Sequence, residues 1–288
     1  MRVIGIARDV VTGADGAAVV AAASFEARFG ADWKLQAIVV TPRREAFAGL
    51  IGVRGGGGFR KALRQAMPTG EQSADPLWLI LDDIVGTVLV SSIAWSEWDP
   101  DWQRKAFGDV PIEQLLKARE NVCIGHAAGS SAQQRDPQDG IDRKPNAADL
   151  WRADDPHGWH AMEPQPGVGF RRMRRMDIAL ADEIRIDAEF QDSATKPAGG
   201  RISVHEYGIG VTADPVSLRM LSLDTDPRVL PYRECPAVSA NLPQLLGERL
   251  SDLRRAVPVA LAGAAGCTHL NDALRAMADV PALLRHIS

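Results

Sequence analysis

The segment Gly266–Asp272 brings a thiol, a hydroxyl, an imidazole, an amide and a carboxylate together in one short stretch. The glycine is typical of a turn, and apolar residues at 270, 274 and 277 then follow at helical spacing. Cys267 and His269 are therefore expected at or just before a helix N-terminus. Exposed backbone amides at such a position favour anions and lower the pKa of a thiol.

Two more segments carry titratable groups: Val204–Tyr207 in a predicted strand, and Pro231–Pro236 in a predicted loop that enters a helix. Neighbouring residues on a strand face opposite sides, so His205 and Tyr207 are expected to share one face while Glu206 points away. If His205 faces the core, it lies where the C-terminal helices would cover the sheet.

Acid–base chemistry by His205 and His269 is the favoured mechanism, because an imidazole titrates near neutral pH and needs no cofactor. A second mechanism makes Cys267 a thiolate nucleophile paired with a histidine. The groups predicted to assist, as orienting carboxylates or oxyanion donors, are Glu206, Asp272, Asn271 and Arg275. The predicted substrate-binding side chains are Tyr207, Arg171, Arg275 and Arg54.

Zinc is the alternative to a cofactor-free site, because thiolates and imidazoles bind it tetrahedrally. The candidate ligands are His205, Cys235, Cys267 and His269. The Cys-x-His spacing is tighter than usual for zinc, and the chain has no CxxC pair. A structural role competes with both chemistries, because a buried cysteine packs as a small hydrophobe and His269, Asn271 and Asp272 can cap a helix.

Two other segments contain arginines that are candidates for binding an anion. Arg54 precedes the glycine run 55–58, which lacks the Lys-Ser/Thr of a phosphate loop, so no nucleotide site is predicted. The basic run at 171–175 could bind a carboxylate or phosphate bidentately. The more common forms of these patterns are a flexible loop and an exposed strand with ion pairs. The pair Asp82-Asp83 is likewise more typical of a solvated helix end than of a metal site.

Composition describes an ordinary globular protein: 288 residues, 45% apolar, 24% charged and a net charge of −4. Nothing in it predicts nucleic-acid binding. The three cysteines are too few for a disulfide-stapled fold, the N-terminal apolar run is too short for a signal peptide, and no stretch approaches the ~18 continuous apolar residues of a membrane span. These features predict a cytoplasmic protein with reduced thiols and no membrane contact.

Periodicity predicts an α+β fold, with antiparallel sheets, helices packed on one side, and two sheet-plus-helix halves. The halves are expected at 1–125 and 166–288, joined by a long loop at 126–165 that is polar and rich in proline at 130–156. The predicted strands are 3–6, 17–29, 33–40, 88–94, 174–181, 184–192, 201–212 and 217–224. The predicted helices are 43–51, 59–67, 77–82, 111–120, 240–246, 250–261, 269–278 and 281–286.

Together these residues resemble a bacterial family catalogued as domain of unknown function 2889. The likeness extends over nearly the whole chain and is densest after residue 170. It is carried by Arg54-Gly-Gly-Gly, Leu79–Asp83, Asp192-Ser193, His205-Glu206-Tyr207, Leu230-Pro231, Glu234-Cys235-Pro236, Leu253-Arg254 and Cys267–Asp272. One departure is Gly125-His126, where a tryptophan is expected after the glycine. The resemblance assigns no catalytic residues, and it loosely implies catabolism of aromatic or polycyclic compounds.

The leading hypothesis is a catabolic enzyme of the lyase or hydrolase type, acting without a cofactor on a small apolar or aromatic substrate. A zinc protein with Cys/His ligands is the second hypothesis. The third is a non-enzymatic protein that binds an apolar ligand or a partner subunit, with tryptophans 95, 98, 102 and 159 lining the interface. Whether the chain forms a homo-oligomer stays open.

Overall fold

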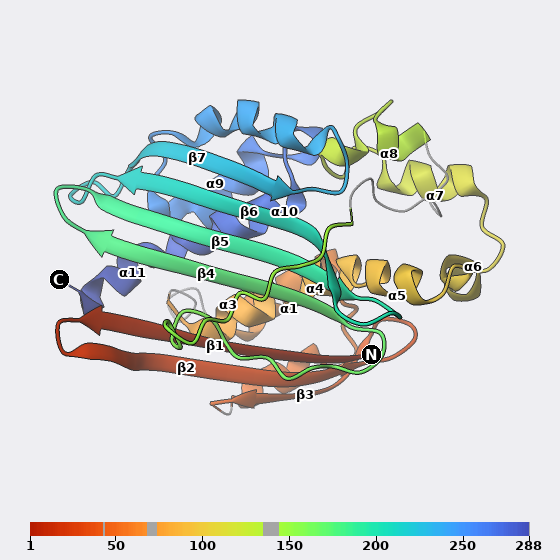
Figure 1. Ribbon diagram of the computed structural model, residues 1–288, viewed down its shortest axis with the longest axis horizontal. Helices are drawn as coiled ribbons and strands as arrows, with labels where there is room; N and C mark the ends of the chain where they lie inside the picture. Colours follow the sequence, from red (N-terminus) through yellow and green to blue (C-terminus); the bar gives the residue numbers. More distant parts are fainter. Residues whose placement is uncertain (43, 68–73, 135–143, 288) are drawn as a thin grey trace. The chain divides into compact units, whose positions relative to one another are not determined.

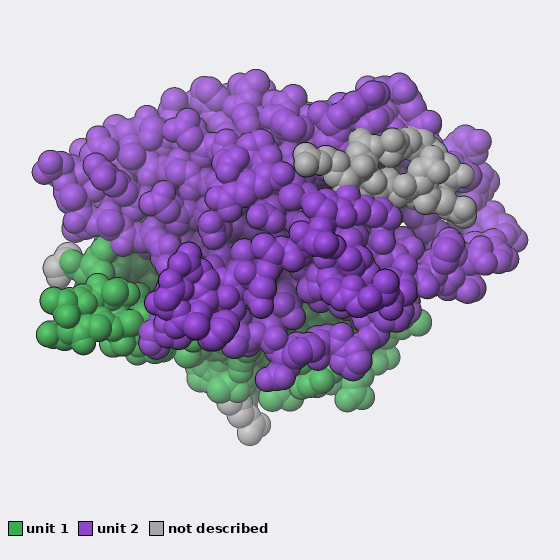
Figure 2. Space-filling model, viewed as in Figure 1, with its two compact units in different colours: residues 1–90, 279–288 green, residues 91–278 purple. Residues whose placement is uncertain are grey.

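The computed structural model divides into two compact units, coloured in Figure 2. The first comprises Met1–Val90 and Asp279–Ser288, and the second Ser91–Ala278. Residues 1–42, 44–67, 74–134 and 144–287 are described. The unit boundaries differ from the predicted halves because helices after Val90 pack on the second sheet. Trp98, for example, donates its indole N–H to the Thr195 carbonyl at 3.1 Å.

The first unit is built on the antiparallel sheet β1(Arg2–Gly13), β2(Gly16–Phe29) and β3(Leu35–Thr41), in the order β1-β2-β3. The strands alternate buried and exposed residues where helices cover one face, as in the second half of β2. Gly16 closes the β1–β2 turn at φ +111°, a conformation that favours glycine. These three strands confirm the predicted meander.

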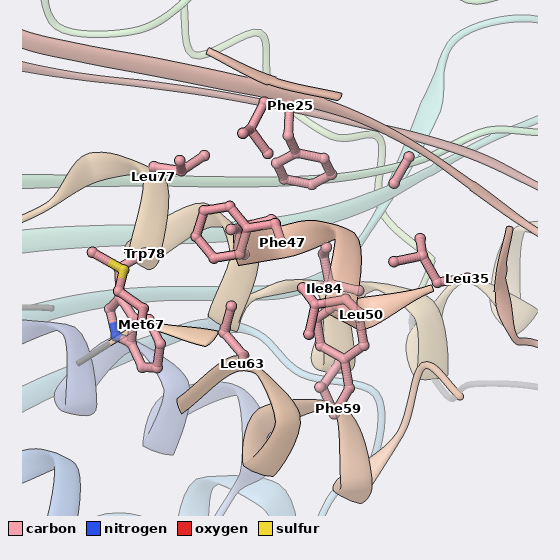
Figure 3. Close-up of a cluster of buried hydrophobic side chains, with 14 of the residues drawn as sticks. Phe25, Leu35, Phe47, Leu50, Phe59, Leu63, Met67, Leu77, Trp78 and Ile84 are labelled. Carbon is pink, nitrogen blue, oxygen red and sulfur yellow. The ribbon is translucent and has the colours of Figure 1, made fainter. Parts of the chain in front are cut away.

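The helices of this unit cover one face of its sheet (Figure 3). They are η1(Glu45–Leu50), α1(Gly57–Ala66), α3(Pro76–Asp82) and α4(Ile84–Val90). Asp75 caps α3 by accepting a hydrogen bond from the Leu77 amide at 2.8 Å, and Pro76 occupies the first helical position. Phe25 of β2 packs with Phe47 and other apolar side chains of the helices in one buried cluster.

The predicted strand at 88–94 is wrong, because this stretch is helical in α4 and in α5(Ser92–Trp98). Ile84, Val85 and Val88 are buried in the core of the first unit, and this packing overrides the strand preference of β-branched residues. The helical stretch Pro76–Trp98 is also long and apolar enough to cross a membrane by length and composition, which by itself is weak evidence. Its Asp82 pairs with Arg60 at 3.2 Å.

Asp9 on β1 makes the stability of the first unit dependent on pH. Burial, aided by the nearby carboxylates of Asp279 and Asp75, raises its pKa to about 6. A raised folded-state pKa contributes stability that is complete below the unfolded value near 3.8 and is lost as the pH rises through about 6.

Asp9→Asn will therefore raise the free energy of unfolding at pH 8 by about 1–2 kcal/mol, after allowance for solvent screening, and by less at pH 5. Urea titrations at the two pH values measure this difference. Asp15→Asn, in the exposed β1–β2 turn, is the control and should change little at either pH. An equal gain from Asp9→Asn at both pH values would contradict the electrostatic explanation.

The second unit contains the antiparallel sheet β4(Phe170–Leu180), β5(Ile184–Thr195), β6(Arg201–Ala213) and β7(Met220–Val229), in that order. All four strands were predicted, with ends displaced by a few residues. The inner strands β5 and β6 bury most of their residues, and the sheet therefore forms the centre of this unit.

Helices cover the face of this sheet that carries His205 and Tyr207, with α9 and α10 drawn in blue in Figure 1. The main ones are η4(Cys235–Leu245), α9(Leu253–Ala260) and α10(Thr268–Ala276), and α9 ends soon after Pro258. The remaining elements of this unit are α6(Trp102–Phe107), α7(Ile112–Arg119), η2(Ile124–His126), α8(Ser131–Gln134), η5(Leu250–Asp252) and η6(Gly263–Ala265). The chain ends with η7(Met277–Asp279), α11(Val280–Leu283) and η8(Leu284–His286). The observed sheets and helices confirm the α+β class.

The predicted polar excursion at 130–156 is described only in part, because 135–143 lie outside the described residues. After this gap the chain runs along the start of β6. Ser203 donates its amide to the Pro145 carbonyl at 2.8 Å, and Ala147 donates to Arg201 at 2.9 Å. The described part of the excursion is thus tied to the second sheet by backbone hydrogen bonds.

Candidate functional site

Three polar side chains form a row across the buried face of the second sheet. Arg172 of β4 is the register partner of Asp192 of β5, and Asp192 is the partner of His205 of β6. Partners directly opposite on antiparallel strands lie on the same face, with side chains in contact distance. The pairing therefore sets an arginine, a carboxylate and an imidazole side by side.

Helix α10 adds three more polar side chains to this row. His269, Asp272 and Arg275 are spaced by three residues, which places them on one helical face, and all three are buried. The helix begins after Cys267, as predicted, with Cys267 as the N-cap residue. Strand register and helical periodicity together build this candidate centre.

The two histidines stack on each other, with ring centroids 3.4 Å apart and an interplanar angle of 19°. Each also turns one nitrogen toward the same oxygen of Asp192. His205 Nδ1 lies 3.7 Å and His269 Nε2 lies 3.6 Å from Asp192 Oδ2. Both nitrogens are buried, and within the part of the chain that is described neither has a hydrogen-bond partner. A buried polar atom left this way is costly unless something else satisfies it.

Arg172 holds Asp192 in place from the opposite side. Its Nε and Nη2 donate to the two carboxylate oxygens at 2.9 and 2.8 Å, and its Nη1 donates to Asp272 Oδ2 at 3.1 Å. Arg275 donates to the other oxygen of Asp272 at 3.1 Å. The Arg172 guanidinium also lies over the Phe190 ring, 4.9 Å from its centroid. Buried charges are thereby paired, and the Asp192 carboxylate is fixed in orientation.

Both imidazoles are neutral at physiological pH. Burial lowers the pKa of His205 well below its ordinary value, and the neighbouring His269 and Arg172 lower it further. Burial and then the Arg172 cation lower the pKa of His269 in the same way. A neutral imidazole keeps a lone pair on one nitrogen, which is the form that binds metals or accepts a proton.

Residues 170–283 match the family described as Protein of unknown function (DUF2889). We call these residues the DUF2889 segment. It contains the whole row of side chains described above. The match confirms the predicted resemblance for the densest motifs, whereas the motifs at Arg54 and Leu79–Asp83 lie outside the matched residues. No curated protein and no solved structure matches the chain.

A cluster of thiols lies near His269 and comprises Cys235 and Cys267 of the DUF2889 segment and Cys123, which precedes that segment. Cys267 Sγ is 3.9 Å from His269 Nδ1. Tyr207 lies close enough to the same sulfur to affect its pKa, although the Tyr207 hydroxyl has no hydrogen-bond partner among the described residues. Burial raises the pKa of Tyr207, and the nearby thiols of Cys267, Cys235 and Cys123 raise it further. Burial raises the pKa of all three thiols, to about 11 for Cys123, so they are protonated at neutral pH.

The predicted zinc set is therefore split. Among the described residues, the ligand atoms that lie within 4.8 Å of one another belong to Asp192, His205 and His269. Cys235 and Cys267 gather near Tyr207 and not with this trio. Cys267 takes the N-cap position of α10, whereas His269 is inside the helix and reaches the sheet, so residues two apart end in different environments.

Gly125 occupies the space between two of the thiols. A Cβ at this position would lie 2.8 Å from Cys235 Sγ and 3.0 Å from Tyr232 Cδ2. Gly125→Ala will therefore lower the free energy of unfolding by about 1–3 kcal/mol, because the buried sulfur must shift. Urea denaturation measures the loss. Gly129→Ala is unsuitable as a control because its φ is +76°. Gly49→Ala, which meets nothing within 4 Å, serves instead and should cost less than Gly125→Ala.

The other predicted site residues divide between this centre and structural roles. Asp272 and Arg275 join the ion-pair network. Glu206 points away from the histidines, as expected, and contacts Gln191 at 3.3 Å and Ser203 at 3.2 Å. It therefore cannot orient either imidazole.

Three further predicted residues do not join the row. Asn271 donates to the Leu261 carbonyl at 3.0 Å and so ties α10 to the end of α9. Arg171 is half-buried beside Arg201, and burial lowers its pKa. Arg54 belongs to the first unit, where its backbone forms an isolated antiparallel β-bridge with Lys34.

The sequence assigned no role to Asp192, and it predicted for Arg172 only the anion binding expected of the basic run. Asp192 stood in a family motif and Arg172 in the basic run, but only the strand register reveals that Asp192 lies beside His205 and that Arg172 lies beside Asp192.

Proposed function

We propose that the DUF2889 segment binds one divalent transition metal through Asp192, His205 and His269, and that this metal acts on a small molecule. The observation that carries the proposal is that two buried histidine nitrogens, neither hydrogen-bonded to any described residue, face one carboxylate oxygen. A metal ion would satisfy both nitrogens at once.

The distances support a site of this kind. Metal–nitrogen and metal–oxygen bonds of about 2.0–2.2 Å at a tetrahedral angle place neighbouring ligand atoms about 3.4 Å apart. The two nitrogen–oxygen separations of 3.6 and 3.7 Å are only slightly longer. Two imidazoles and one carboxylate suit zinc or ferrous iron, and three protein ligands leave positions open for water or substrate.

The surroundings support it as well. Neutral imidazoles bind a metal without first losing a proton. Arg172 donates two hydrogen bonds to Asp192, which is the type of outer contact that orients a ligating carboxylate. A bound metal would supply Lewis-acid chemistry, which polarises a carbonyl or lowers the pKa of bound water. Such chemistry is compatible with a lyase or hydrolase, and we propose small apolar or aromatic compounds as its substrates on the basis of the family resemblance.

A cofactor-free acid–base centre is the second candidate, favoured by a different observation. Stacked rings direct their in-plane lone pairs nearly parallel, so one ring must rotate before both can bind a single ion. The His269 ring meanwhile lies between a thiol and a carboxylate: its Nδ1 is 3.9 Å from Cys267 Sγ, and its Nε2 is 3.6 Å from Asp192 Oδ2. This order of thiol, imidazole and carboxylate suits proton transfer or nucleophilic catalysis once the contacts tighten.

Metal analysis separates the two candidates. The full chain, purified without a histidine tag, would be analysed by mass spectrometry and then titrated, after chelation, with Zn²⁺ and anaerobic Fe²⁺. About one ion per chain, lost in His205→Asn and His269→Asn alike, is the expected result. Binding that survives in both variants, or no binding at all, would overturn the metal proposal. The acid–base candidate would then be tested by screening aromatic esters and hydroxy acids.

A further inference from the structure

The second ring nitrogen of His269 decides whether its Nε2 can bind a metal. A neutral imidazole carries its proton on one nitrogen and its lone pair on the other. Nε2 has a lone pair directed toward Asp192 only when Nδ1 carries the proton. The groups around Nδ1 therefore determine whether Nε2 has a lone pair available for a metal.

Two acceptors lie beside Nδ1. Cys267 Sγ is 3.9 Å away, within hydrogen-bond range for sulfur, and Thr268 Oγ1 is 3.4 Å away. On the other side of the ring, Nε2 is 3.6 Å from Asp192 Oδ2, which already accepts a hydrogen bond from Arg172 Nη2 at 2.8 Å. The Nδ1–H form thus has two acceptors within hydrogen-bond range, whereas for the Nε2–H form the Asp192 oxygen at 3.6 Å lies just beyond that range.

The Cys267 sulfur is suited to accept this proton's hydrogen bond. The thiol is buried, with 3% of the residue exposed, and the backbone at the start of α10 fixes it beside the ring. Tyr207, on the same sheet face as His205, lies close enough to Cys267 to affect the pKa of the thiol, although its hydroxyl has no hydrogen-bond partner among the described residues. The backbone N–H of Asn271 donates to the Cys267 carbonyl at 2.8 Å, and this hydrogen bond begins the helix that carries His269.

We propose that Cys267 is a positioning residue that holds His269 in the Nδ1–H form and leaves Nε2 free to bind the metal. The proposal rests on the proposed metal site for its consequence. The protonation of His269 in the metal-free protein can be measured independently of that site. Outer contacts to metal-bound histidines typically change metal affinity by about 10–100-fold.

The test uses the full chain with ¹⁵N-labelled histidine, and the His269 signals are assigned by comparison with His269→Asn. Long-range nitrogen–proton NMR spectra of the metal-free protein report which nitrogen carries the proton. Zn²⁺ affinity is measured in parallel by competition with a chromogenic chelator. The variants are Cys267→Ala, which removes the acceptor, Cys267→Ser, which keeps one, and Thr268→Val, which removes the competing acceptor. Cys123→Ser is the matched thiol control.

The expected result is an Nδ1–H ring in the wild type and in Cys267→Ser, Thr268→Val and Cys123→Ser. Cys267→Ala should show a substantial Nε2–H population and about 10-fold weaker Zn²⁺ binding. An unchanged ring in Cys267→Ala, or a change produced by Thr268→Val and not by Cys267→Ala, would overturn the proposal. If the ring changes as expected but the wild type binds no metal, Cys267 positions His269 and the proposed function fails alone.

Discussion

Replacing Arg172 by methionine will lower the free energy of unfolding by about 3–5 kcal/mol, the cost expected when one partner of a buried ion pair is removed. Only 4% of the Arg172 side chain and none of the Asp192 side chain is exposed. Without the guanidinium, Asp192 loses two charge-assisted hydrogen bonds and Asp272 loses one. The carboxylates then remain buried with less compensation. Urea denaturation followed by circular dichroism measures the effect.

Arg175→Met is the matched control on the same strand. Arg175 pairs with Asp177 at 2.7 Å and with Asp155, but these partners are 58% and 40% exposed. Exposed pairs contribute about 0–1 kcal/mol, so the control should cost much less. The double variant Arg172→Met/Asp192→Leu should be less destabilised than the sum of the two single variants, because it leaves no unpaired carboxylate at 192. Additive losses, or equal costs at 172 and 175, would contradict the buried-network explanation.

Local pattern was enough to predict most elements of the second unit. The strands β4–β7 alternate and are separated by turn residues such as Gly199-Gly200, and α10 follows Gly266 with apolar residues at helical spacing. The error at 88–94 has a different origin. Val88, Leu89 and Val90 favour a strand locally, but Ile84, Val85 and Val88 gain more by burying one helical face in the core of the first unit.

The candidate site was predicted only in part, because its partners come from strand register. His205 and His269 were expected to act together, and their rings stack. Their shared carboxylate is Asp192 and not Glu206 or Asp272. A strand sequence shows which residues share a face, but not which residue of the next strand lies opposite. The bulge at Asp192/Ser193 shifts that pairing further, and no periodicity reveals it.

The thiols show that residues grouped from the sequence can be separated by the fold. Cys235, Cys267 and the two histidines were grouped as a zinc set because their ligand types suit zinc, although their spacing in the sequence argued against it. The fold instead puts Cys267 at the helix N-cap beside Tyr207, and His269 against Asp192. The apparent single site becomes a histidine–carboxylate centre with a thiol behind one of its rings.

His269→Ala will abolish tight metal binding, with a loss of affinity of at least about 100-fold, more than an outer contact would cause. The reason is geometric, because only two protein ligands, Asp192 and His205, remain. A water molecule does not take the place of the lost His269 nitrogen as a ligand. His205→Ala should have an equal effect, because both rings face the same carboxylate oxygen.

Competition with a chromogenic chelator measures the dissociation constants, and circular dichroism verifies that each variant is folded. His157→Ala, at an exposed position of the second unit, is the control and should bind as the wild type does. If His157→Ala weakens binding as much as His269→Ala, the metal is held at the surface; if His205→Ala alone leaves binding intact, the ligand set excludes β6 and the stacked pair has another role.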